Sequence, residues 1–352
     1  MGVNLLITSS GGVWTRNLVY QINNKSIYGT IKIHATDTKK DLKIKNFVDS
    51  FHQVPESKSA NYIRKIIDIV KKKSIELIIP GSDEEAIQLS ISKKKLKKAG
   101  ANLACVDYKY LKFFKDKLST YKKLDKAKIR KPLWKKALTA KQLKIIVLNF
   151  LKSKKEVVIK PAYSRGGRDI TVIRSNFKKK IISKNFGRER HISEEHFFKK
   201  EYKKYLKKMP VIVMERLFEP SYDLDLLAWN GKLIKCVLRK RIGAQGIKGN
   251  IIEKSKKKIK IYAKKVVKIF KLSWLYDCDI MLNKNSEPIV MELNPRISGS
   301  LYASLAAGVP LIDDLISLSR KEFNKIKKKN IKKNILIIPN IDPNKLRLKY
   351  IN

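Results

Sequence analysis

The first 108 residues alternate short apolar runs with amphipathic segments, and this alternation limits the fold more than any other feature of the chain. Val3–Thr8 and Ile31–Ala35 have the length and composition of buried strands, and a turn at Gly11–Gly12 lies between them. Strands that alternate with helices favour a parallel, doubly wound sheet in an α/β fold. The further elements expected here are helices at Thr15–Gln21, Tyr62–Lys72 and from Ser82 onward, and strands at Leu77–Pro80 and Leu103–Val106.

The turn between the first strand and the first helix invites a dinucleotide-binding interpretation, with Asp37 as the acid that would bind a ribose. The run Ser9-Ser10-Gly11-Gly12 lacks the G-x-G-x-x-G spacing that this interpretation needs. The better prediction is a Rossmann-like domain whose turn is free of nucleotide or faces a substrate.

The rest of the chain divides by pattern into further segments. A basic helix is expected at Tyr110–Lys126, and Asn230-Gly231 between two apolar runs is a strong hairpin signal. Ile335–Ile338 is the one strand-like run of a basic C-terminal tail. The predicted organisation is a Rossmann-like domain at 1–108, a smaller α+β unit at 109–214, a larger α+β unit at 215–320 and the tail at 321–352.

The charge of the chain at first suggests a nucleic-acid-binding protein. The formal net charge is +49 and the pI is about 10.1, which is typical of such proteins. Only 14 of the 80 basic residues are Arg, however, and the Lys are spread along nearly the whole length. Base and phosphate recognition favours Arg, so we expect a solvated lysine surface, no specific nucleic-acid partner and only salt-sensitive attraction to polyanions.

Cysteine and histidine patterns point away from disulfides and zinc. The three cysteines are odd in number and widely separated, which fits a reducing cytosol. His191 and His196 are five residues apart and would not share one helix face. The apolar N-terminal run lacks a basic leader, and no apolar stretch reaches the length of a membrane span. These features predict a cytoplasmic protein without a membrane partner.

The run at 289–300 carries the clearest chemical signal. Ile289–Met291 looks like a buried strand that ends on Glu292 and Asn294, whose side chains share one face because they are two positions apart. Pro295 stops the strand, and Arg296 adds a guanidinium at the same corner. Oxygen ligands beside a guanidinium suit a phosphate bound to magnesium.

Hairpin symmetry supplies a partner for this corner. Asp279–Leu282 and Ile289–Glu292 are expected strands, and the midpoint of Asp279 and Glu292 falls inside the turn that joins them. The two carboxylates would therefore face each other, which requires a cation between them. Asn294 adds a third oxygen, so Mg²⁺ (or Mn²⁺) is the expected metal. The alternative, a pair of solvated acids, fits poorly with such apolar flanks.

Two further segments suggest nucleotide binding. Lys160 ends an apolar strand and precedes a loop with two glycines and several donors, which is not a Walker A motif but suits phosphate oxygens. The segment after the strand at Val211–Glu215 could offer backbone groups and a carboxylate to an adenine edge, and Asp223 with Asp225 could hold a ribose hydroxyl. The loop residues are Ser164, Arg165, Gly166, Gly167 and Arg168, and the hinge residues are Glu215, Arg216, Leu217 and Phe218.

In this order, the motifs resemble the ATP-grasp superfamily, especially its carbamoyl-phosphate synthase and biotin carboxylase branch, from the N-terminal domain to about residue 310. Met291–Arg296 is the most specific part. The resemblance implies a Rossmann-like domain followed by an ATP-grasp fold of two α+β subdomains. It also implies roles: phosphate binding by Lys117 and Lys160, a phosphate lid at Gly166-Gly167, an adenine hinge at Glu215 and Arg216–Phe218, ribose binding by Asp223, magnesium on Asp279, Glu292 and Asn294, and an anion clamp at Arg296.

The chain departs from the family pattern in three places. Its glycine loop is shorter and more basic, and Asp279 stands where the family uses Glu or Gln, so one or two metal ions remain open. Residues 239–249 look more like stand-alone carboxylate–amine ligases, in which Arg239 or Arg241 could hold the substrate carboxylate. The chain also lacks the second ATP-grasp copy of a full carbamoyl-phosphate synthase.

These features together predict an ATP-dependent ligase. A substrate carboxylate would attack the terminal phosphoryl group of ATP, and an amine would displace phosphate from the resulting acyl phosphate. One alternative is activation of bicarbonate in the manner of biotin carboxylase. Another is a basic nucleic-acid-binding protein with a degenerate ATP-grasp core. The identities of the acid and the amine and the oligomeric state, including a homodimer, stay open.

Overall fold

A computed structural model describes residues 2–23, 26–40, 42–114, 116–153, 156–162, 169–175, 181–182, 189–243, 246–254, 257–283, 285, 287–326 and 334–351. The chain forms two compact units. Unit 1 combines Met1–Lys112, Ser221–Ile280 and Glu292–Asn352, and unit 2 combines Phe113–Pro220 with Met281–Met291. Within the described ranges, no helix is both long enough and apolar enough to cross a bilayer.

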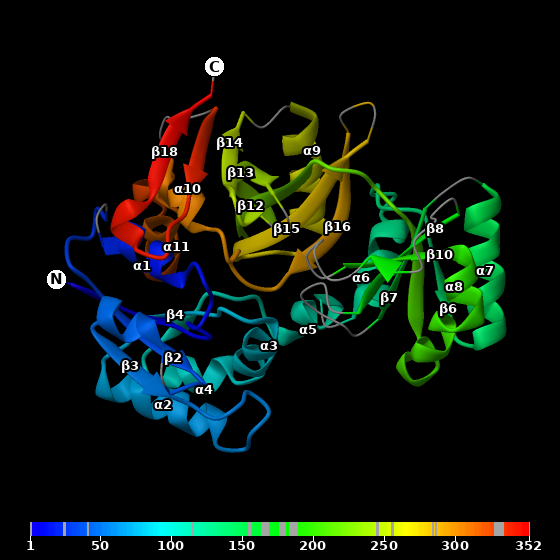
Figure 1. Cartoon of the computed structure of the whole chain (residues 1–352). Helices are drawn as coiled ribbons and strands as arrows, with labels where there is room; N and C mark the ends of the chain where they lie inside the picture. Colours follow the sequence, from blue (N-terminus) through cyan, green and yellow to red (C-terminus); the bar gives the residue numbers. More distant parts are fainter. Residues whose placement is uncertain are drawn as a thin grey trace. The chain divides into compact units, whose positions relative to one another are not determined.

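The N-terminal part of unit 1 is a parallel sheet with the strand order β3-β2-β1-β4-β5, which confirms the predicted doubly wound α/β architecture (Figure 1). Its strands are β1 (Val3–Ile7), β2 (Ile31–Asp37), β3 (Ser50–Gln53), β4 (Leu77–Ile79) and β5 (Asn102–Leu103). The edge strand β3 was not expected, because its half-exposed residues form no apolar run.

Helices cover both faces of this sheet. The strand order changes direction after β3, so right-handed crossovers place α1 on one face and α2 on the other (Figure 1). Ser82 caps α3 as the capping-box spacing predicts, since its hydroxyl accepts the Glu85 N–H at 3.3 Å. The helices of this part are α1 (Thr15–Asn23), η1 (Lys43–Phe47), α2 (Tyr62–Lys72), α3 (Asp83–Ile91), α4 (Lys93–Lys98) and α5 (Tyr108–Leu111).

The larger sheet of unit 1 has the order β16-β15-β12-β13-β14-β17-β18, with α9 packed on β12 and β13 and α10 against β14. The tips of β15 and β16 extend into unit 2. Its strands are β12 (Ser221–Trp229), β13 (Lys232–Ile242), β14 (Gly249–Glu253), β15 (Trp274–Leu282), β16 (Pro288–Asn294), β17 (Ile335–Ile338) and β18 (Arg347–Tyr350). Its helices are α9 (Lys257–Ile269), α10 (Tyr302–Ala306), α11 (Leu311–Arg320), η5 (Phe323–Lys325) and η6 (Pro343–Lys345).

The predicted hairpin at Asn230-Gly231 is confirmed and sets the start of β13. Asn230 has a φ of 48° and Gly231 a φ of 75°, as a two-residue primed turn requires. One register shift follows at Leu227/Ala228, and beyond it Asp223 lies directly opposite Arg239.

Unit 2 is built on a mixed sheet with the order β6-β11-β7-β8-β10-β9. Its strands are β6 (Trp134–Ala137), β7 (Val157–Pro161), β8 (Ile170–Arg174), β9 (Ile181–Ile182), β10 (Glu189–Ser193) and β11 (Val211–Glu215). Its helices are α6 (Lys117–Lys126), α7 (Ala140–Lys152), α8 (Glu194–Lys199) and η3 (Glu201–Lys208), and η2 (Lys112–Phe114) joins the two units in sequence.

The prediction of one continuous helix at Tyr110–Lys126 is wrong. The segment forms α5, η2 and a separate α6, which begins at Lys117. Asp116 explains the new start, because one of its carboxylate oxygens accepts the Leu118 N–H and the other the Ser119 hydroxyl, each at 2.8 Å. An aspartate that caps a helix in this way ends the preceding one.

The core of unit 2 gives a test of the assignment of α7. Leu143 is fully buried, whereas Leu148 on the same helix is 38% exposed. Leu143→Ala should lower the free energy of unfolding by about 2–5 kcal/mol, measured by urea denaturation followed by circular dichroism. Leu148→Ala is the matched control and should change it by less than about 0.5 kcal/mol. Equal effects of the two substitutions would contradict the orientation of this helix.

Candidate active site

Three aspartates converge on neighbouring strands of the larger sheet in unit 1. Asp223 lies on β12, and Asp277 and Asp279 lie on β15 with side chains on one face, since they are two residues apart. One carboxylate oxygen from each lies within 4.8 Å of the others, in the spacing of a metal-ion site. Carboxylates this close together require positive charge.

Arg239 on β13 supplies one fixed positive charge. Its Nε and Nη2 donate to the two oxygens of Asp225, each at 2.8 Å, and its Nη1 donates to Asp223 at 3.0 Å and to the Ser300 hydroxyl at 2.5 Å. The Arg239 side chain is fully buried, and the Ser304 hydroxyl also donates to Asp225. This guanidinium therefore ties β12, β13 and the segment before α10 together.

Arg241, two residues further along β13, supplies a second charge in a different setting. Its Nη2 donates to Asp223 and, at 2.7 Å, to Asp279. Its side chain keeps 20% of its surface exposed. Asp223, predicted as the ribose acid, thus has one oxygen bonded to Arg241 and the other to Arg239.

The end of β16 places Asn294 and Arg296 on Asp277. The Asn294 amide donates to Asp277 Oδ2 at 3.0 Å, and Arg296 Nη1 donates to the same oxygen at 3.2 Å. Because the amide nitrogen faces Asp277, the amide oxygen is turned away and can serve as a ligand. Sequence reasoning did not single out Asp277, yet this residue is 3% exposed.

One oxygen of this cluster has no hydrogen-bond donor. Asp277 Oδ1 is buried and accepts no hydrogen bond from any residue that the structure describes, and Arg239 Nη2 is 4.0 Å away. A buried carboxylate oxygen without a donor is costly. A cation would satisfy it, so the residues present fit a divalent metal ion.

The electrostatics agree with a site that takes a further cation. Burial alone would raise the pKa of Asp223, but Arg241 and Arg239 outweigh it and lower the pKa to about 2. Burial and then the charge of Asp223 raise the pKa of Asp277 to about 6, although Arg296 opposes this. Burial also raises the pKa of Asp279, and Asp277, Asp223 and Glu292 add to this effect against Arg241. The nearby arginines therefore do not fully offset the burial of the Asp277 and Asp279 carboxylates.

The predicted metal ligands share this region. Asp279 on β15 and Glu292 on β16 belong to neighbouring strands, but the metal-spaced trio among the described residues is Asp223, Asp277 and Asp279 and does not include Glu292. The charge of Glu292 contributes to the raised pKa of Asp279, and Asn294 is bonded to Asp277. The donor set is made of carboxylate and amide oxygens, which suits Mg²⁺ or Mn²⁺.

The two predicted phosphate-binding lysines belong to unit 2, on adjoining segments. Lys117 begins α6, and its backbone N–H donates to the Ala162 carbonyl at 3.4 Å, just beyond β7. Lys160 on β7 is 7% exposed, and its Nζ donates to the Tyr121 hydroxyl at 3.1 Å. Tyr121 in turn donates to the Met291 carbonyl at 2.8 Å. Sequence reasoning did not single out Tyr121, which lies within a lysine-rich helix without a motif.

Two residues of the predicted hinge at the end of β11 interact with other residues of unit 2. Glu215 accepts the Leu133 N–H at 2.8 Å, and Arg216 pairs with Glu189 at 3.1 Å. Leu217 is partly buried and Phe218 is 65% exposed. The predicted phosphate loop, with Ser164, Arg165, Gly166, Gly167 and Arg168, lies outside the described residues.

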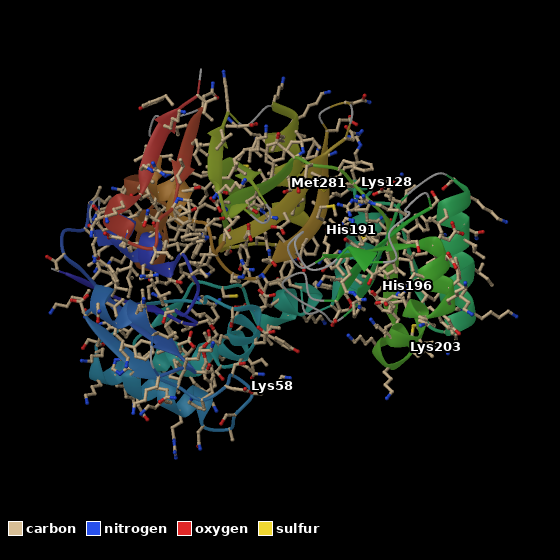
Figure 2. The ribbon with its side chains drawn as sticks, in the orientation of Figure 1. Lys58, Lys128, His191, His196, Lys203 and Met281 are labelled. Atoms are coloured by element: carbon tan, nitrogen blue, oxygen red, sulfur yellow. The ribbon has the colours of Figure 1, made fainter. Side chains whose placement is uncertain are left out.

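Two histidines of unit 2, labelled in Figure 2, lie close to different glutamates. His191 Nε2 on β10 lies 3.1 Å from Glu189, and His196 Nε2 on α8 lies 3.6 Å from Glu201. Burial and then the charge of Arg216 lower the pKa of His191. These contacts stabilise unit 2 locally and do not bring the two imidazoles to a common ligand.

Arg239 should be essential to the stability of unit 1. Arg239→Met removes the bidentate partner of buried Asp225 and one of the two guanidinium partners of buried Asp223, and we expect a loss of about 3–5 kcal/mol in the free energy of unfolding. Arg320→Met breaks a half-exposed pair with Glu76 and should cost about 1 kcal/mol or less. Urea denaturation of both variants measures the difference, and a similar small loss in each would refute the framework role of Arg239.

Comparisons with known proteins agree with this architecture. A family described as "ATP-grasp in the biosynthetic pathway with Ter operon" matches residues 207–340, and the "PylC-like, N-terminal domain" family matches residues 5–104. No curated protein sequence matches the chain.

Solved structures of similar fold cover nearly the whole chain. N5-carboxyaminoimidazole synthetase from Staphylococcus aureus, in complex with ADP, matches with a TM-score of 0.67 at 14% identity, over 96% of this chain and 81% of that one. Biotin carboxylase from Campylobacter jejuni matches with 0.66 at 16% identity, over 95% and 74%. L-amino acid ligase from Bacillus licheniformis matches with 0.65 at 12% identity, over 95% and 78%. Residues 207–340 thus match an ATP-grasp family behind a PylC-like N-terminal domain at 5–104, and the fold of nearly the whole chain is that of these solved structures.

Proposed function

We propose that this chain is an ATP-dependent, magnesium-dependent ligase of the cytoplasm that joins a small carboxylic acid to an amine. The observation that carries the proposal is the buried oxygen cluster of Asp277, Asp279 and Asn294 beside the guanidinium of Arg296. In an ATP-grasp chain, such a cluster can hold a metal ion next to a reacting anion. The biotin carboxylase and the amino acid ligase of similar fold support this choice of reaction.

Unit 2 would bind the nucleotide. Lys117 and Lys160 bring positive charge to phosphate oxygens, and Tyr121 holds the Lys160 ammonium in place at 3.1 Å. The loop around Gly166-Gly167, with Ser164 and Arg165, would cover the phosphates. The segment of Glu215, Arg216, Leu217 and Phe218 would contact the adenine through backbone groups and the exposed Phe218 ring.

The acidic cluster of unit 1 would hold the metal ion. Asp279, Glu292 and Asn294 are the proposed ligands, and Asp277, which belongs to one metal-spaced trio with Asp279, would add a further carboxylate oxygen. When bound, Mg²⁺ neutralises negative charge on the transferred phosphoryl group. Asp277 orients Asn294 and Arg296 through one shared oxygen.

The substrate carboxylate would attack the terminal phosphoryl group of ATP, so that the bond to the β-phosphate oxygen breaks, ADP leaves and an acyl phosphate forms. The amine then attacks the acyl carbon, and inorganic phosphate leaves. Arg296, 22% exposed at its side chain, is the proposed clamp for this anion, and Arg241 is a second candidate. We assign Arg239 to the framework instead, because it is fully buried and its donors are engaged.

Bicarbonate is the second candidate for the activated acid. A biotin carboxylase domain of similar fold, from the 2-oxoglutarate carboxylase of Hydrogenobacter thermophilus, was solved with MgADP and bicarbonate, which favours it. The two candidates differ in one respect, because a bicarbonate-activating enzyme turns over ATP with bicarbonate and without an amine.

A phosphate-release screen tests the reaction. Carboxylic acids and amines, singly and in pairs, are incubated with the enzyme and Mg-ATP, and bicarbonate alone is included. We expect ADP and phosphate to appear only with one acid–amine pair, and both to disappear with EDTA. Turnover with bicarbonate alone selects the second candidate. Steeply salt-dependent RNA binding that is unaffected by ATP, with no turnover at all, would contradict both.

Glu292→Gln tests the metal assignment. It removes one anionic ligand without changing size, so phosphate release at a fixed Mg-ATP concentration should fall by about 100-fold or more. Glu287→Gln in the same hairpin is the control, because Glu287 bonds with Arg130 and Asn283 outside the cluster and should keep its activity. Full turnover in Glu292→Gln would remove this residue from the metal site.

A further inference from the structure

Arg239 and Arg241 project from the same face of β13 yet differ in their surroundings. Arg239 has no exposed side-chain surface, and its donors are shared among Asp223, Asp225 and Ser300. Arg241 has 20% of its side-chain surface exposed, and its Nη2 bonds to Asp223 and Asp279. The Arg239 side chain is therefore fully enclosed and hydrogen-bonded, whereas the Arg241 side chain is partly accessible to solvent.

The contact of Arg241 with Asp279 bears directly on metal binding. Asp279 Oδ1 accepts Arg241 Nη2 at 2.7 Å, and the same carboxylate is a member of the trio that can hold a metal ion. A guanidinium and a divalent cation at one carboxylate repel each other strongly in a buried setting. A cation that binds Asp279 therefore competes with Arg241.

We propose that Arg241 is an internal counter-ion of the acidic cluster, which neutralises Asp279 and Asp223 until a divalent cation binds and then leaves Asp279. This inference rests on the proposed function, because it concerns the same metal site. It adds an ordered step to that function: metal binding releases a guanidinium from a carboxylate. The released guanidinium can then bind an anionic substrate, so that metal and substrate would bind cooperatively.

The contact between Arg241 and Asp279 should stabilise the metal-free protein but weaken its affinity for the metal ion. Without metal, Arg241 stabilises unit 1, because its guanidinium donates to the carboxylates of Asp223 and Asp279. With metal, the same charge weakens binding of the cation. Removing the charge should therefore lower stability in EDTA and raise affinity for the metal, a combination that the loss of an ordinary structural contact would not produce.

The test compares Arg241→Gln, Arg241→Lys and wild type, each as the full chain. Binding of Mn²⁺ alone is titrated by electron paramagnetic resonance, and the melting temperature is measured in EDTA and in Mn²⁺. We expect Arg241→Gln to bind Mn²⁺ about tenfold more tightly than wild type. Its melting temperature in EDTA should fall by about 2 °C or more, and Mn²⁺ should raise it more than it raises that of wild type. Arg241→Lys retains the charge and should stay near wild type.

Arg320→Gln is the matched control, because it removes an arginine of unit 1 that pairs with Glu76 outside the cluster. It should leave Mn²⁺ affinity unchanged.

Unchanged or weaker Mn²⁺ binding by Arg241→Gln, with wild type binding normally, overturns the counter-ion proposal and leaves the proposed ligase intact. If wild type and all variants fail to bind Mn²⁺, the metal site itself is wrong, and both proposals fall. If Arg241→Gln folds only when Mn²⁺ is present, the counter-ion role is supported.

Discussion

The buried guanidinium of Arg239 holds the strands that carry the candidate site. Its bidentate contact with Asp225 and its bond to Asp223 join β12 to β13, and its bond to Ser300 reaches the segment before α10. A buried charge network is stabilising only when every member is satisfied. The cost of burying Asp225 is offset by its two bonds to Arg239, whereas Asp223 is compensated by Arg239 and Arg241 together.

The cluster contains more carboxylates than arginines, and this excess of negative charge enables it to bind a cation. Asp223 is fully compensated, whereas burial raises the pKa of Asp277 and Asp279. Asn294 and Arg296 both donate to one oxygen of Asp277, and among the described residues none donates to the other oxygen. The carboxylates carry more negative charge than the nearby arginines neutralise, and hydrogen bonds hold them in place. Both properties favour binding of a small divalent cation.

Much of the architecture could be predicted because its signals are local. Hydrophobic runs predicted β1, β4 and β17, and the Ser82 cap and the Asn230-Gly231 turn have short-range causes. The helix at 110–126 was mispredicted since a single side chain, Asp116, starts a new helix within an unbroken basic pattern. Asp277 was passed over because its burial depends on elements distant in sequence.

The sequence by itself determined the strand that carries Glu292 and Asn294, the corner at Arg296 and the turn that reverses β12 into β13. Only the tertiary structure decided which arginine meets which aspartate. The turn alone would place Asp223 opposite Leu238, but the register shift at Leu227/Ala228 moves Arg239 into that position. A register shift of one residue moves every following side chain to the other face of a strand. This shift therefore decides which side chains form the site, and no pattern in the sequence predicts it.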